Sequence, residues 1–118
     1  MIPFALAQEL KSAGFTQSPA SHAIYALNEH LRIRRENAIQ MWYGSKAKAG
    51  VALQLEEEAV YTPTLSELAI ACGRPLHLMC NESGIWEAFK FVDAPRVEGC
   101  ETAEEALGRL WLLMQPSD

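Results

Sequence analysis

One amphipathic segment with both a start and a stop signal, residues 62–73, most strongly constrains the fold of this 118-residue chain. Thr64 and Glu67 have the spacing of a capping box, in which each side chain satisfies an N–H group of the first helical turn. Apolar residues follow with helical periodicity, and Gly73 then ends the pattern. The segment therefore predicts a helix that buries one face.

The C-terminal part of the chain has a second segment of this kind. Thr102 and Glu105 repeat the capping-box spacing, and Pro116 lies just beyond the last apolar residue. The side chains predicted to enter the core from this helix are Ala106, Leu107, Leu110, Trp111 and Met114. We expect the helix to pack on one face of a sheet.

Another helix is predicted at the N-terminus, from about Pro3 to Ala13. Proline suits a first helical turn, because the N–H group that it lacks would have no partner there. Gly14 supplies a left-handed residue at the C-terminal end, and Phe15 can pack back as in a Schellman motif.

A further helix is predicted to begin near Ser18 or Ser21, because Ile24, Leu27 and Leu31 share one helical stripe.

The stretch that follows, residues 32–40, allows two interpretations. Ala38 and Met41 could extend the helical stripe, whereas the alternation of apolar residues over 39–43 suits a strand. We favour the strand, with residues 51–55 as its hairpin partner.

Residues 76–80 and 85–92 predict two strands that flank a four-residue turn, 81–84, and Val97 predicts a short edge strand. The predicted fold class is α+β: three to four helices packed on a small antiparallel β-sheet, in a single domain that spans 1–118.

Composition places the chain among ordinary globular proteins, with 49% hydrophobic and 21% charged residues. No apolar run approaches the roughly 20 residues that a membrane span needs. Residues 1–10 have no positively charged leader. The three cysteines match no paired zinc-ligand spacing, and their odd number leaves one thiol unpaired within a monomer. We therefore expect a soluble, cytoplasmic protein with reduced thiols and no membrane partner.

The net charge of −5 is unevenly distributed. Residues 30–50 carry five cations against one carboxylate, a local charge of +4, so the rest of the chain carries −9. Aromatic residues are interleaved with these cations, as in surfaces that bind single-stranded nucleic acid or acidic proteins. The candidate binding residues of this basic region are Arg32, Arg34, Arg35, Trp42, Tyr43, Lys46 and Lys48. The alternative is a solvated hairpin whose Trp42 packs in the core.

No convergent catalytic set is evident in the sequence. His77 and Cys80 could form a base–nucleophile pair, but a spacing of three on a strand places them on opposite faces. Cys72 ends an apolar helical stripe, where cysteine behaves as a small hydrophobe. We predict no catalytic residues.

No metal site or cofactor is predicted either. Apart from His77 and Cys80, the histidines and cysteines lack the spacing of helix-borne zinc ligands. The carboxylates of Glu56–Glu58 would diverge on an extended chain, and no glycine-rich phosphate loop is present.

Two segments, TPTLSELAIACGRP (62–75) and ETAEEALGRLWLLM (101–114), resemble a group of small phage and prophage proteins of unknown function. The chain is also similar to them in its N-terminal segment, ALAQELKSAGF (5–15), and in the Trp-Glu-Ala stretch at 86–88. Gly108 stands where alanine is common in the group, and we expect it to cost about 1 kcal/mol of helix stability. The resemblance implies a mobile-element origin and an α+β fold, and it brings no catalytic residues.

From these observations we expect a non-enzymatic protein that binds a host protein or nucleoprotein complex, such as a defence complex. Its acidic surface would compete with nucleic acid for basic clefts. Nucleic-acid binding through the basic region is one alternative. A small cysteine-dependent enzyme that uses Cys80 or Cys100 is the other.

Overall fold

The computed structural model describes residues 2–36 and 59–115. Within these ranges the helices are α1 (Phe4–Ser12), α4 (Leu65–Cys72) and α5 (Ala103–Met114). The strands are β1 (Ile24–Ala26), β2 (Arg32–Arg34), β3 (Val60–Tyr61), β4 (His77–Cys80), β5 (Trp86–Phe89) and β6 (Val97–Cys100). The α+β class predicted from the sequence is therefore confirmed.

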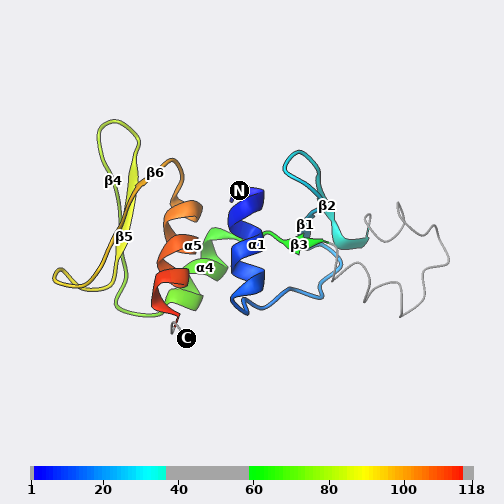
Figure 1. The fold of residues 1–118 in the computed structure, drawn as a ribbon, viewed down its shortest axis with the longest axis horizontal. Helices are drawn as coiled ribbons and strands as arrows, with labels where there is room; N and C mark the ends of the chain where they lie inside the picture. The colour runs from blue at the N-terminus through cyan, green and yellow to red at the C-terminus, as the bar shows by residue number, and fades with distance from the viewer. Residues whose placement is uncertain (1, 37–58, 116–118) are drawn as a thin grey trace.

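The strands form two separate antiparallel sheets, with the orders β2–β1–β3 and β4–β5–β6. The three helices stand between these sheets, so that the sheets occupy opposite ends of the described fold (Figure 1). Helix α5 packs on the β4–β5–β6 sheet and α1 lies between α5 and β3. The predicted packing of the C-terminal helix on a sheet is thus confirmed, whereas the prediction of one sheet is wrong.

The core has two apolar clusters of unequal size. The large cluster joins the buried residues of α1, α4 and α5 to one face of the β4–β5–β6 sheet, and it also includes Ala26 of β1 and Val60 of β3. A small cluster of Ala23, Tyr25, Ala59 and Tyr61 lies under the other sheet, where the Tyr25 and Tyr61 rings are 5.6 Å apart. The β2–β1–β3 sheet thus covers the small cluster and also contributes to the large one.

The predicted C-terminal end of α1 is confirmed, whereas the helix begins at Phe4 with Pro3 as its N-cap, one residue later than predicted. Phe15 N–H donates to Leu10 O (2.9 Å) and Gly14 N–H donates to Lys11 O (3.1 Å), which are the two bonds of a Schellman motif. Gly14 has φ +94°, a conformation that a side chain would strain.

The capping box of α4 is also present. Thr64 Oγ1 accepts from Glu67 N–H (3.2 Å), and the Glu67 carboxylate accepts from Thr64 N–H (3.1 Å). The C-cap is Gly73, with φ +74°.

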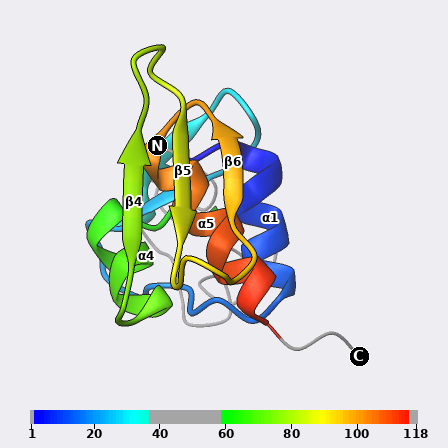
Figure 2. The ribbon, with the colours of Figure 1, turned by 90° about the vertical axis from the view of Figure 1, so that its left-hand side faces the viewer.

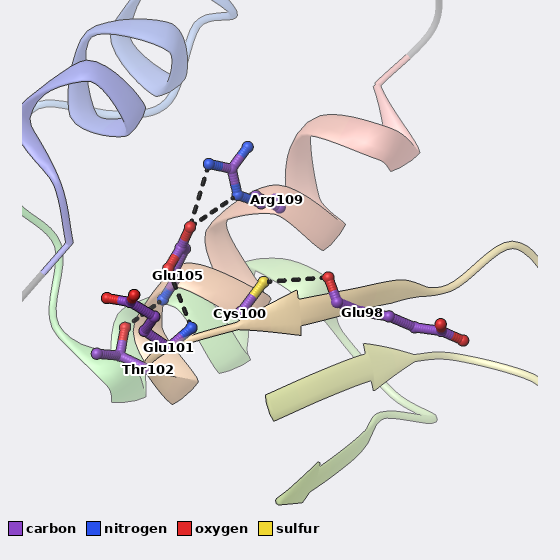
Figure 3. A network of polar contacts seen from close by, with 6 residues as sticks. All are labelled: Glu98, Cys100, Glu101, Thr102, Glu105 and Arg109. Carbon is purple, nitrogen blue, oxygen red and sulfur yellow. Dashed lines mark hydrogen bonds and ion pairs between the residues drawn. The ribbon is translucent and has the colours of Figure 1, made fainter. Parts of the chain in front are cut away.

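Only half of the box predicted for α5 forms. Thr102 Oγ1 accepts from Glu105 N–H (3.1 Å), but the Glu105 carboxylate accepts from Glu101 N–H (3.3 Å), one residue earlier than expected (Figure 3). Arg109 also binds this carboxylate, with Nε and Nη2 each 3.1 Å from Oε1.

The core side of α5 differs from the prediction at its C-terminal end. Ala106, Leu107 and Leu110 are buried, whereas Trp111 is half-buried and Met114 is exposed. The buried face of α5 therefore ends at Leu110.

The helix predicted from Ser18 or Ser21 is wrong, because this part of the chain forms the hairpin of β1 and β2. The Asn28 side chain accepts from the N–H groups of His30 (2.8 Å) and Leu31 (2.9 Å), and these bonds stabilise the turn. The helical spacing of Ile24, Leu27 and Leu31 therefore does not correspond to a helix in the structure. The strand favoured over 39–43 and its partner at 51–55 lie outside the described residues, and β2 at Arg32–Arg34 was not predicted as a strand.

The second hairpin was predicted with nearly correct limits. Strands β4 and β5 pair from His77 opposite Phe89 to Cys80 opposite Trp86, and Asn81 Oδ1 accepts from Ser83 and Ile85 N–H within the turn. Strand β5 ends at Phe89 rather than near residue 92, and β6 forms the predicted edge strand.

Candidate interaction surface

Exposed apolar side chains gather where α5 ends and where the loop from β5 to β6 turns. Phe91 is 54% exposed, Leu113 51% and Met114 40%. Together with Pro95 they surround a hollow of about 220 Å³, whose wall also includes the buried Leu110. We call Phe91, Pro95, Leu113 and Met114 the apolar patch. Figure 2 shows the β5–β6 connection at the same end of the molecule as the C-terminal end of α5.

The β5–β6 loop is held by hydrogen bonds at both of its ends. Ala94 N–H donates to Phe91 O (3.0 Å) and closes a turn, and Lys90 Nζ donates to Cys72 O at the end of α4. Arg96 Nη2 lies 3.4 Å from Val92 O. These bonds fix the backbone that carries Phe91. The Phe91 side chain is therefore exposed on a loop whose conformation is held by hydrogen bonds.

The outer face of the β4–β5–β6 sheet is occupied by a stack of side chains. The His77 ring lies 4.8 Å from the Phe89 ring and nearly parallel to it, and the Arg96 guanidinium lies 4.3 Å from the Phe89 ring centroid. Arg96 Nη1 is also 3.5 Å from Glu87 Oε2. His77 therefore packs against an aromatic ring rather than against Cys80.

The three thiols lie in different environments. Cys72 and Cys100 are buried, and burial raises the pKa of both thiols, although Lys90 acts in the opposite direction on Cys72. For Cys100 the nearby Glu105 raises the pKa further, while Arg109 lowers it (Figure 3). Cys80 is exposed, and its Sγ is 3.5 Å from Asn81 O.

Among the described residues, the two buried thiols lack the features of a reactive cysteine. A nucleophilic cysteine needs a lowered pKa and a base beside it. Burial acts in the opposite direction on two of the thiols, and in the part of the chain that the structure describes no thiol is hydrogen-bonded to a histidine.

The described arginines of the basic region lie at the other end of the molecule, on or beside the edge strand β2. Arg34 is exposed, whereas Arg32 and Arg35 are partly buried. Burial lowers the pKa of Arg32. The other predicted binding residues, Trp42, Tyr43, Lys46 and Lys48, lie outside the described residues, as do Glu56–Glu58.

Residues 2–36 and 59–115 contain no group of three His, Cys, Asp or Glu side chains that could hold a metal ion. Within the same ranges, no helix combines the length and the apolar character that crossing a bilayer requires.

Sequence reasoning missed the apolar patch. Phe91 was assigned to a strand and Met114 to the core, and Leu113 lies off the predicted buried stripe. The available signal was the turn sequence Asp93-Ala94-Pro95, which ends the strand early and leaves an apolar residue in a loop.

Comparison with protein-family models, with curated proteins and with solved structures finds no match to this chain.

Proposed function

We propose that this protein is a non-catalytic binding protein that engages a partner protein through the apolar patch. One observation carries the proposal: large apolar side chains from two distant segments surround one hollow and remain about half exposed. Contiguous exposed apolar surface of this kind marks interaction sites on soluble domains. Aromatic residues and methionine are also enriched at the centres of protein interfaces.

The energetics favour covering the patch. Fully burying a Phe, Leu or Met side chain is worth roughly 1.5–3 kcal/mol relative to leaving it exposed. In the free protein only part of this burial free energy is gained, because the side chains of Phe91, Leu113 and Met114 remain about half exposed. A partner that fills the hollow gains the remainder, and the held β5–β6 loop limits the conformational entropy that binding costs.

The resemblance to phage and prophage proteins makes a host macromolecule, such as a defence complex, the expected partner. Nucleic-acid binding through the basic region and thiol chemistry remain predictions for which the described residues add no support.

The proposal is tested by binding experiments with a double variant, Phe91→Ser/Leu113→Ser. The wild-type protein should retain a stoichiometric partner from a host-cell lysate, and the double variant should weaken its affinity by about tenfold or more, the effect of losing hot-spot side chains. Met79→Ser is the matched control, because Met79 is equally exposed but lies on β4 away from the hollow.

Circular dichroism and thermal unfolding check that each variant folds. A folded double variant that keeps full affinity, or a wild-type protein that captures no stoichiometric partner, contradicts the proposal.

A further inference from the structure

A second surface feature is a groove of about 440 Å³ between the end of α1, the side of α4 and the indole of Trp111. Its apolar wall includes Phe15 and Trp111, whose rings meet edge to face with centroids 5.0 Å apart. Ile70 stands at the rim and is 80% exposed. Trp111 is only half-buried, so part of its surface is available to a ligand.

One carboxylate, that of Glu67, lines this otherwise mostly apolar groove. Its Oε1 accepts hydrogen bonds from the Tyr61 hydroxyl, from Thr64 N–H (3.1 Å) and from Thr64 Oγ1 (3.0 Å). In the described part of the chain, Oε2 has no hydrogen-bond partner. The carboxylate is thus fixed through Oε1, and Oε2 keeps its capacity to accept a hydrogen bond.

The charge of Glu67 is maintained at neutral pH. Burial raises the pKa of the carboxyl, but the hydrogen bonds from Tyr61 and Thr64 outweigh it, with a further contribution from the nearby His22. The net result is a lowered pKa. No lysine or arginine is among the residues that line the groove.

These features define the chemistry that would complement the groove. A fixed anion beside an indole and an aliphatic rim attracts a cation on an apolar stem, because the stem covers the apolar wall while the charge reaches the carboxylate. Arginine gains most over lysine when its fork spans both oxygens of a carboxylate, and it loses that advantage where it uses one oxygen, as Arg109 does on Glu105. Here Oε1 already accepts three hydrogen bonds, so a compact ammonium that contacts Oε2 alone fits better.

We propose that this groove binds a lysine side chain of a partner polypeptide. A polypeptide suits it better than a free amine, because the groove is open and the exposed Ile70 offers contact to residues that flank the lysine. This site is separate from the apolar patch, and the inference does not rest on the proposed function.

The test uses short peptides as probes, because no natural ligand is identified. Titration of the full chain with acetyl-Leu-Lys-Leu-amide should shift the Trp111 indole N–H signal in NMR spectra, with a dissociation constant on the order of 1 mM. The same peptide with norleucine in place of lysine should bind at least about fivefold more weakly, since it lacks the charge-assisted hydrogen bond. The arginine peptide should also bind more weakly than the lysine peptide. Equal binding of the norleucine or the arginine peptide overturns the inference.

Variants locate the site. Glu67→Gln should weaken binding of the lysine peptide at least about fivefold, whereas Glu104→Gln, a change of another half-buried carboxylate, should leave it unchanged. Should Glu67→Gln fail to fold, Ile70→Ser tests the same groove, because its side chain is exposed and its loss should weaken binding. Unchanged affinity in the folded groove variants overturns the proposed site.

A titration with n-butylammonium tests whether the groove binds a free amine or the lysine side chain of a polypeptide. We expect it to bind more weakly than the lysine peptide, because it lacks flanking residues to contact Ile70. Equal affinity would identify a free amine as the ligand and overturn the assignment to a polypeptide.

Discussion

At the scale of single residues, burial decides what each cysteine can do. Cys72 completes the buried face of α4, and its Sγ lies 3.5 Å from Leu107 O in α5. The sequence predicted this role, since Cys72 continues an apolar helical stripe. Cys100 gave no such signal, because its burial depends on the position of β6 against α5.

We predict that the three thiols differ in their rates of alkylation. At neutral pH, iodoacetamide should modify Cys80 faster than Cys72 and Cys100 by roughly tenfold or more, because burial restricts access and raises the pKa of the other two thiols. Mass spectrometry of digested, time-resolved samples measures the rates, and denatured protein provides the control in which all three should react alike. Fast modification of Cys100 in the folded protein would contradict this prediction and would support the alternative that the protein is a cysteine-dependent enzyme.

At the scale of helices and strands, the sequence predicted those elements whose signals are local. The ends of α1 and α4 depend on residues within a few positions of each other, such as Gly14 with Phe15 and Thr64 with Glu67. The β1–β2 hairpin was missed, because β1 gains its second neighbour, β3, from a distant part of the chain. Tertiary pairing of this kind overrides a short helical pattern.

Both N-caps should contribute measurably to stability. Thr64→Ala and Thr102→Ala should each lower the free energy of unfolding by about 1 kcal/mol, because each removes a side-chain acceptor from a first-turn N–H. Chemical denaturation measures the loss. Thr64→Ser and Thr102→Ser keep the hydroxyl and should retain most of the stability, so an equal loss in the serine variants would contradict a capping role.

At the scale of the whole molecule, the close approach of α1 to α5 joins the helices into one layer. Gly108 is buried in α5, and a β-carbon at this position would lie 3.1 Å from Leu6 Cδ2 and 3.7 Å from Leu10 Cδ1. The sequence indicated only the cost of a helical glycine. The structure explains why glycine stands at this position, since a larger residue would press against α1.

Gly108→Val should therefore destabilise the protein by about 2 kcal/mol, because overpacking of a core typically costs 1–3 kcal/mol. Thermal or chemical unfolding measures the change. In Gly108→Ala the gain in helix propensity opposes a milder contact with Leu6, so the difference from the wild type should be smaller. A valine variant as stable as the wild type would show that α1 can move away freely.

The position of α1 has a consequence for the behaviour of the two ends of the molecule. On one side α1 packs against α5, and on the other it contacts β3, near which Lys11 Nζ donates to Ala59 O (2.9 Å). The two sheets share no strand, but Ala26 and Val60 of the β2–β1–β3 sheet also pack in the large apolar cluster. Detaching the first helix would remove its contact with β3 and the bond from Lys11 to Ala59. The arginine-bearing end would then be held to the rest of the fold by the packing of Ala26 and Val60 and by the hydrogen bond from Tyr61 to Glu67.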